Sequence, residues 1–100
     1  MERGGYIYIM ANRIRSVLYV RVTSQLSIRV DNHKNGIGSQ FTSKYKCIDL
    51  IYYKGFPFIV EAIKREKQMK KWKRDWKMNV IRELNPNLDD LSSIVFKERL

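Results

Sequence analysis

The pattern of large apolar side chains predicts two adjacent strands at the start of the chain. Residues 6–10 and 17–22 each alternate large side chains with a period of two, which is typical of half-buried strands. The six residues between them are mostly polar and suit a hairpin connection. On this pairing Tyr8 and Tyr19 occupy alternating positions of neighbouring strands, from which both can project from one face of the sheet.

A helix is predicted next, with Thr23 or Ser24 as its N-cap and an end at about Lys34. Four residues spaced i, i+3, i+4 and i+7 share one face of it, namely Leu26, Arg29, Val30 and His33. Two of the four are polar and basic. That composition is unusual for a helix face that should turn inward.

The second half of the chain predicts a loop, a third strand and a long helix. Residues 35–46 are rich in Gly, Ser, Lys and Thr and suggest the loop. Residues 48–53 resemble a strand that Gly55 and Pro57 end. A helix is then expected over residues 58–84, with an apolar stripe at three- and four-residue steps made of Ile59, Ile63, Met69, Trp72, Trp76 and Val80.

Glu66 interrupts this apolar stripe. A carboxylate in such a position costs desolvation energy unless a cation meets it, so Glu66 is the most notable acid of the chain. Asn85-Pro86-Asn87 breaks the helix, and the spacing of apolar residues from 91 to 98 suggests a short amphipathic helix. We therefore expect one α/β (α+β) domain over residues 1–91, with a three-stranded antiparallel sheet flanked by helices, and a tail or short helix over 92–100.

The charge of the chain favours a polyanionic partner. Twenty Lys and Arg against ten Asp and Glu give a formal net charge of +10, and residues 61–77 carry eight basic against three acidic residues. A charge run is often only a solvated helix face, but here the balance of the whole chain agrees with the run and favours nucleic acid. The alternative partner is an anionic membrane surface, reached through the basic segment that contains Trp72 and Trp76.

Composition excludes several other classes of protein. A chain of 100 residues with 44% hydrophobic and 30% charged residues is typical of one compact domain. No apolar run approaches the roughly 20 residues of a membrane span, and residues 1–5 lack the apolar core of a signal peptide. We expect a cytoplasmic protein with no membrane and no obligate protein partner. Cys47 is the single cysteine, so any metal must be held by oxygen or histidine.

Several motifs, in order, make the chain similar to the GIY-YIG nuclease family, in particular to its small stand-alone bacterial members. The first motif is Tyr-Ile-Tyr-Ile at residues 6–9, with Tyr8 at its tyrosine position. The second spans residues 18–23, with Tyr19 eleven residues after Tyr8. Arg29 follows ten residues later and His33 four after that.

The resemblance continues through the second half and covers about residues 5–91. Tyr45 lies in a Phe-Thr-Ser-Lys-Tyr segment like the one before the third strand of small bacterial members. Glu66 falls at the metal-ligand position of the family, and Asn85-Pro86 matches the asparagine after the last main helix. Each match alone is weak, whereas six in order at matching spacings are specific.

The resemblance implies a metal-dependent endonuclease that hydrolyses phosphodiester bonds. Glu66 would hold a divalent metal, with Mg²⁺ expected, since such a cation is commonly held by one or two carboxylates together with water and substrate oxygens. Arg29 can bond phosphate bidentately. In the family one motif tyrosine is thought to be the general base, which implies Tyr19 or Tyr8. A phenol with a pKa near 10 needs its phenolate stabilised for that role.

The remaining candidates would support the reaction or bind the substrate. His33 and Tyr45 would orient water or contact phosphate, and Asn85 completes the site that the resemblance implies. The candidate nucleic-acid contacts are Arg21, Lys70, Lys71, Lys73 and Arg74, with DNA expected more than RNA.

Each candidate also has an ordinary structural explanation. The two tyrosines can be strand aromatics, and the basic pair Arg29 and His33 can be a solvated helix flank. Glu66 can simply pair with Lys70 four residues later.

Arg21 is a departure from the family pattern, because it replaces the glycine that closes the second motif. A glycine at such a point permits close approach of a ligand. Arg21 alternates onto the same face as Tyr19, where it can crowd the scissile phosphate or add a contact to it. Leu88 is a lesser departure, at a position where small members often carry tryptophan.

Three functions therefore remain in competition. The leading one is a metal-dependent endonuclease, and the alternative is a nucleic-acid-binding module whose catalysis Arg21 weakens or abolishes. The third is a basic structural protein, such as a ribosome-associated factor, which explains the charge but predicts neither Glu66 in the apolar stripe nor the spacing of the tyrosines.

Overall fold

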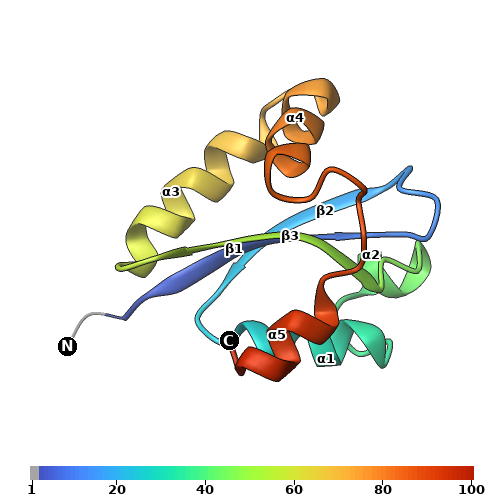
Figure 1. Ribbon diagram of the computed structural model, residues 1–100, viewed down its shortest axis with the longest axis horizontal. Helices are drawn as coiled ribbons and strands as arrows, with labels where there is room; N and C mark the ends of the chain where they lie inside the picture. The colour runs from blue at the N-terminus through green and yellow to red at the C-terminus, as the bar shows by residue number, and fades with distance from the viewer. Residues whose placement is uncertain (1–2) are drawn as a thin grey trace.

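The computed structural model describes residues 3–100 and contains a three-stranded antiparallel sheet with helices on both faces (Figure 1). The strands are β1 (Gly5–Ala11), β2 (Leu18–Thr23) and β3 (Asp49–Phe56), in the order β2-β1-β3. Strand β1 is therefore bonded on both sides. The expected fold class is confirmed.

Five helices cover the sheet. In Figure 1, α3 and α4 lie on one side of the strands and α1, α2 and α5 on the other. Their bounds are α1 (Leu26–Lys34), α2 (Gln40–Lys44), α3 (Ile59–Lys70), α4 (Arg74–Leu84) and α5 (Ser92–Glu98). Within residues 3–100, none of the helices combines the length and the apolar character that crossing a bilayer requires.

The alternation of β1 divides the core into two clusters. Ile7 and Ile9 are fully buried against α3 and α4, in a cluster that includes Ile81. Tyr8 and Met10 point to the opposite face, in a cluster with residues of α1 and of α5. Because the side chains of a strand alternate between faces, the two odd-numbered residues pack the core on one side and the two even-numbered ones reach the other.

The prediction of one long helix over residues 58–84 is wrong, because the chain turns between α3 and α4. A single helix of that length would be about 40 Å long, which is the whole long axis of a molecule measuring 39 × 29 × 25 Å. Trp72 lies in the turn, where the Arg65 guanidinium is 4.7 Å from the centre of its ring. Trp76, expected in the buried stripe, is 58% exposed on α4.

Other expected boundaries also need correction. The N-cap of α1 is Gln25 rather than Thr23 or Ser24, and the Thr23 hydroxyl accepts a hydrogen bond from the Gln25 backbone N–H. Strand β3 continues through Gly55, because Gly55 pairs with Tyr6 of β1. The expected loop 35–46 contains helix α2. At the C-terminus, residues 92–98 form α5, the short amphipathic helix that the spacing of apolar residues suggested, and its Val95 is buried.

Helix α2 begins with a capping box formed by Ser39 and Thr42. The Ser39 hydroxyl accepts from the Thr42 backbone N–H, and the Thr42 hydroxyl accepts from the Ser39 backbone N–H. Such a reciprocal pair satisfies two backbone donors that the first turn leaves open. It stabilises a helix of only five residues.

Candidate functional site

Strand pairing brings Tyr8 and Tyr19 to one face of the sheet. Tyr8 is directly opposite Arg21 of β2, and Met10 is directly opposite Tyr19. Directly opposed residues of antiparallel strands share a face, as do residues two apart on one strand. Tyr8, Tyr19 and Arg21 therefore all lie on the α1 side of the sheet, as the alternation in the sequence predicted.

A chain of hydrogen bonds connects Tyr8 with helices α1 and α2. The Tyr8 hydroxyl lies 3.1 Å from Nε2 of His33 on α1, and Nδ1 of His33 lies 3.2 Å from the Thr42 hydroxyl on α2. All three residues are buried. The spacing of α1 thus turns His33 inward onto the strand tyrosine.

The His33 ring occupies space that is free because Gly38 has no side chain. A Cβ atom at Gly38 would lie 2.0 Å from Nδ1 of His33, a distance that atoms cannot adopt. Gly38 and Thr42 both belong to the segment that was expected to be a loop. The available signal was the spacing of Ser39 and Thr42, which suits a variant capping box and so a helix start within the segment.

A row of aromatic rings extends from Tyr19 to the surface. The Tyr19 ring lies edge-on to His33, with 5.8 Å between ring centres, and stacks on Phe41 at 5.4 Å. Phe41 in turn contacts Tyr45, whose ring centre is 4.7 Å away. Tyr45 caps the C-terminus of α2 and is 42% exposed. Tyr45 thus joins the site through Phe41, which was not among the predicted site residues.

Two arginines place positive charge beside these rings. Cζ of Arg21 lies 5.7 Å from the centre of the Tyr19 ring, a separation typical of a cation-π contact. Arg29 lies exposed on α1, one turn before His33. The charges of both arginines act on Tyr8 and on His33, so the two cations border the same site.

The environment shifts both hydrogen-bonded groups toward their neutral forms. Burial raises the pKa of Tyr8 to about 12, and Tyr19 and Glu66 act in the same direction, while Arg29 and Arg21 act in the opposite one. Burial also lowers the pKa of His33, and Arg29 and Arg21 lower it further. A neutral phenol next to a neutral imidazole is the resulting state at neutral pH.

Glu66 lies on the buried side of α3, which packs against β1 and β2. Its carboxylate is 3.4 Å from the Lys70 ammonium, so the ordinary i,i+4 pairing does occur. Its charge nevertheless contributes to the raised pKa of Tyr8. Within residues 3–100, no three His, Cys, Asp or Glu side chains group as metal ligands. One carboxylate fits a hard divalent cation only if water and substrate oxygens complete the shell.

Asn85 does not contact the tyrosine cluster. Its side-chain N–H groups donate to the carbonyls of Ile51 and Asp89, and its Oδ1 accepts from the Asp89 backbone N–H. These three bonds fix the turn after α4 against strand β3. The position of Asn85 is therefore that of a buried turn residue, 4% exposed.

Four of the five basic residues expected to contact nucleic acid lie where α3 ends and α4 begins, whereas Arg21 lies on β2 beside the tyrosines. Lys70 closes α3, Lys71 and Lys73 are exposed in the turn, and Arg74 opens α4. Arg74 is fixed by hydrogen bonds to the backbone carbonyls of the β1–β2 hairpin. The structure thus brings these four together, on the α3–α4 side of the sheet rather than on the tyrosine side.

Comparison with known proteins matches residues 4–79 to the model of the GIY-YIG catalytic domain. The chain belongs to the GIY-YIG family. It is 33% identical over 78 residues to a UPF0213 protein of Staphylococcus saprophyticus, covering 78% of this chain and 94% of that one. A UPF0213 protein of Clostridium perfringens is 34% identical over 76 residues, covering 76% and 81%.

A solved structure supports the fold of this GIY-YIG domain. The solution NMR structure of a UPF0213 protein from Bacillus halodurans aligns with a TM-score of 0.56 at 22% identity, over 89% of this chain and 94% of that one. The GIY-YIG domain places the chain in a family of nucleases, which act on nucleic acid and generally use divalent metals.

Proposed function

We propose that this GIY-YIG domain is a cytoplasmic, metal-dependent endonuclease that hydrolyses phosphodiester bonds, with DNA favoured over RNA as substrate. The observation that carries the proposal is the buried Tyr8–His33 hydrogen bond in a site bordered by Tyr19, Arg29 and Arg21. A buried tyrosine hydroxyl normally has a hydrogen-bond partner, but an ordinary structural pair has no need of two arginines beside it. Phosphodiester hydrolysis needs an activated water and positive charge around the phosphoryl oxygens.

Tyr8 is the group that we assign as general base. At a pKa of about 12, about one molecule in 100,000 carries the phenolate at pH 7, so Tyr8 needs help to accept a proton. His33 is placed to give it: neutral His33 can take the Tyr8 proton at Nε2 as Tyr8 takes one from the attacking water. Tyr19 then borders the water and the phosphate rather than receiving the proton.

The Thr42 hydroxyl orients His33 for this step. When it donates to the Ser39 carbonyl, 3.2 Å away, and accepts from the Ser39 backbone N–H, its second lone pair is left for Nδ1–H of His33. That hydrogen bond holds the proton on Nδ1 and leaves Nε2 as an acceptor facing Tyr8. The tautomer of a histidine follows from what its other nitrogen binds.

Charge neutralisation is assigned to Arg29 and to a cation at Glu66. The planar Arg29 guanidinium can bond two phosphate oxygens at once. A divalent cation held by Glu66, with Mg²⁺ the expected ion, would supply Lewis-acid stabilisation of the phosphate and the leaving oxygen. Lys70 pairs with Glu66 at 3.4 Å, so this pairing would have to open for Glu66 to hold the cation.

A binding module with weakened cleavage is the second candidate, and the position of Arg21 favours it. Arg21 lies directly across from Tyr8 and over the Tyr19 ring, on the face where the substrate must approach. A glycine at this point would leave that space open. The cation can therefore hold a phosphate away from Tyr8 instead of presenting it.

Cleavage of labelled nucleic acid tests the proposal directly. Single- and double-stranded DNA and RNA of one sequence are incubated with the protein in Mg²⁺ and in chelator, and products are resolved at single-nucleotide resolution. We expect Mg²⁺-dependent internal cleavage that Glu66→Gln abolishes, which also excludes a contaminating nuclease. Tight binding of all four substrates without cleavage would instead support the binding module.

A further inference from the structure

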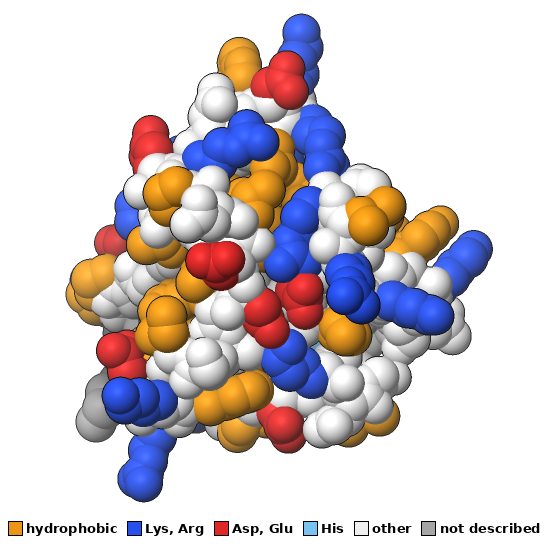
Figure 2. All heavy atoms as spheres, turned by 45° about the vertical axis from the view of Figure 1, so that its right-hand side comes forward, with side chains coloured by type: hydrophobic (Ala, Val, Ile, Leu, Met, Phe, Trp, Pro, Cys, Tyr) orange, Lys and Arg blue, Asp and Glu red, His pale blue; other side chains and the backbone are white. Residues whose placement is uncertain are grey.

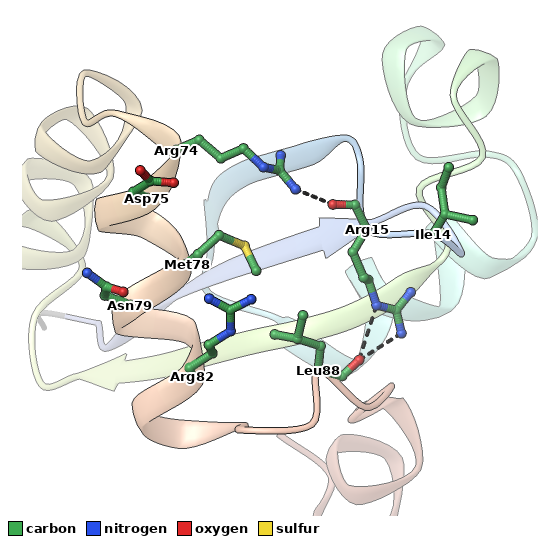
Figure 3. Close-up of a pocket in the computed structure, with 8 residues that line it drawn as sticks. All are labelled: Ile14, Arg15, Arg74, Asp75, Met78, Asn79, Arg82 and Leu88. Carbon is green, nitrogen blue, oxygen red and sulfur yellow. Dashed lines mark hydrogen bonds between the residues drawn. The ribbon is translucent and has the colours of Figure 1, made fainter.

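A cleft of about 660 Å³ lies between helix α4 and the hairpin that joins β1 to β2 (Figure 3). Its volume is within the range of about 300–1,000 Å³ that is typical of small-ligand sites. Met78 of α4 faces into the α3–α4 side of the core. The cleft therefore lies on the opposite side of the sheet from Tyr8 and Tyr19, at the hairpin from which the Tyr19 strand starts.

The cleft has an apolar floor and basic sides. Met78 and Leu88 lie at its base, and Ile14 of the hairpin, 79% exposed, lies at its edge. Figure 2 shows hydrophobic side chains within a hollow that Lys and Arg side chains border. An apolar surface framed by guanidinium groups suits a ligand that has a flat apolar part and an anionic part.

Two arginines hold the walls of the cleft together. The Arg15 guanidinium donates twice to the Leu88 carbonyl, at 3.1 and 2.9 Å, and pairs with Asp49 at 2.6 Å. Arg74 donates from α4 to the Arg15 carbonyl across the opposite end of the cleft. Both Arg15 and Leu88 have a left-handed backbone, with φ of 60° and 55°, a conformation disfavoured for side chains of their size. The shape of the cleft is thus fixed before any ligand arrives.

Arg82 is the cation that these contacts leave available. Among residues 3–100 no carboxylate lies within 4.0 Å of its guanidinium, and no hydrogen bond engages it. In Figure 3 its guanidinium points over the floor toward Met78. Asp75, the acid in the lining, lies seven residues earlier on α4, about 10 Å along the helix axis. All five donors of Arg82 can therefore serve an anion.

We propose that this cleft binds one nucleotide unit of a nucleic-acid strand, outside the tyrosine site. Its phosphate is held by Arg82, its base lies on Met78 and Leu88, and the Asn79 amide reaches the edge of the base. The nature of the ligand rests on the proposed nuclease function, but binding here does not require cleavage. A nucleic-acid strand that passes around the β1–β2 hairpin would contact the cleft on one side of the sheet and the tyrosines on the other.

Two binding measurements test this cleft. Methyl resonances of Met78 and Leu88 are followed by NMR during titration with AMP and with inorganic phosphate, and anisotropy measures binding of a labelled 12-nucleotide DNA. We expect AMP to shift both residues in wild type and not in Arg82→Gln. We also expect Arg82→Gln to weaken DNA binding roughly tenfold. Lys67→Gln is the matched control, because it removes one positive charge from an exposed position of α3, and it should weaken binding less than twofold.

The outcomes separate the cleft from the nuclease. Equal losses of DNA affinity in Arg82→Gln and Lys67→Gln, or AMP-induced shifts that persist in Arg82→Gln, would contradict the nucleotide site in the cleft. Neither result would affect the proposed nuclease if the wild type cleaves. Absence of any nucleic-acid binding by wild type would overturn both proposals.

Discussion

The hydroxyl of Tyr8 and Nε2 of His33 lie 3.1 Å apart although the two residues are 25 positions apart in the chain. Both are nearly inaccessible, at 3% and 4% exposure. A buried polar pair of this kind loses its benefit entirely when one partner is removed, because the other keeps its desolvation cost. The pair is therefore a sensitive point for both stability and chemistry.

Tyr8→Phe should abolish cleavage while the protein still folds. The change leaves Nε2 of His33 without its partner, so we expect a loss of about 1–3 kcal/mol in unfolding free energy. Single-turnover cleavage and urea denaturation measure the two effects. Tyr52→Phe, on the opposite face of the sheet, is the matched control and should retain cleavage. Equal rates for Tyr8→Phe and wild type would rule out Tyr8 as the base.

Gly38→Ala should reduce cleavage strongly, because its Cβ would displace the His33 ring from Tyr8. Gly36→Ala is the informative control. Gly36 has φ of 75° with open space around it, so alanine there should cost about 1–2 kcal/mol of stability without touching the site. Cleavage measured at a temperature where both variants are folded distinguishes the two. Full activity of Gly38→Ala would mean that His33 has no part in the reaction.

Glu66→Gln should remove Mg²⁺-dependent cleavage while the fold is kept, since glutamine preserves size and hydrogen bonding but not charge. Glu61→Gln, on the first turn of the same helix, should cleave like wild type. The rate is measured as a function of Mg²⁺ concentration for all three proteins. Retained cleavage by Glu66→Gln at low Mg²⁺ would show that Glu66 is not the ligand.

Arg21→Gly should raise the single-turnover rate and weaken substrate binding. The guanidinium occupies the approach to Tyr8 and Tyr19, and its loss removes a charge-assisted contact worth about 0.5–2 kcal/mol. Glycine also weakens a strand by about 0.5–1 kcal/mol, so Arg21→Ala is measured beside it. Weaker binding with no gain in rate would mean that Arg21 contacts the phosphate productively. Unchanged rate and affinity would show that it points away from the substrate.

Stability should fall as the pH drops below about 6.5, and His33 should be the cause. Its pKa is lowered in the folded protein, first by burial and then by Arg29 and Arg21, so the unfolded chain binds the proton at a higher pH. The stability from the neutral ring is complete above the unfolded pKa and is lost as the pH falls through the folded one. Chemical denaturation from pH 8 to 5 should show a smaller decline for His33→Gln. Parallel curves would contradict this assignment.

The sheet and the shared face of Tyr8 and Tyr19 could be predicted from the local spacing of residues in the sequence. Period-two alternation in the first two strands is enough to place Tyr8 and Tyr19 on one face, and helical spacing places Arg29 and His33 on a common side of α1. These inferences succeed because strand and helix geometry fix side-chain direction locally. They do not depend on how distant parts of the chain pack.

The failures have a different origin. No proline or glycine marks the break between α3 and α4, so sequence alone continues the helix; the chain turns because α4 must lie against the sheet and hairpin, where Arg74 binds. Phe41 and Thr42 were missed because their contacts with Tyr19 and His33 depend on a short helix within an apparent loop. The contacts of Asn85 also arise from tertiary packing.

The central place of β1 has a consequence for motion. Backbone amides of Tyr8 and its neighbours are bonded between two strands and lie between two cores, so their hydrogen exchange should require global unfolding. Helix α2 is one short turn held by a cap, and its amides should exchange through local opening. Tyr8, the proposed general base, would then lie on the element whose amides exchange most slowly. Phe41 and Tyr45 lie on or next to α2, which could open and close around a nucleic-acid strand many times before the whole domain unfolds once.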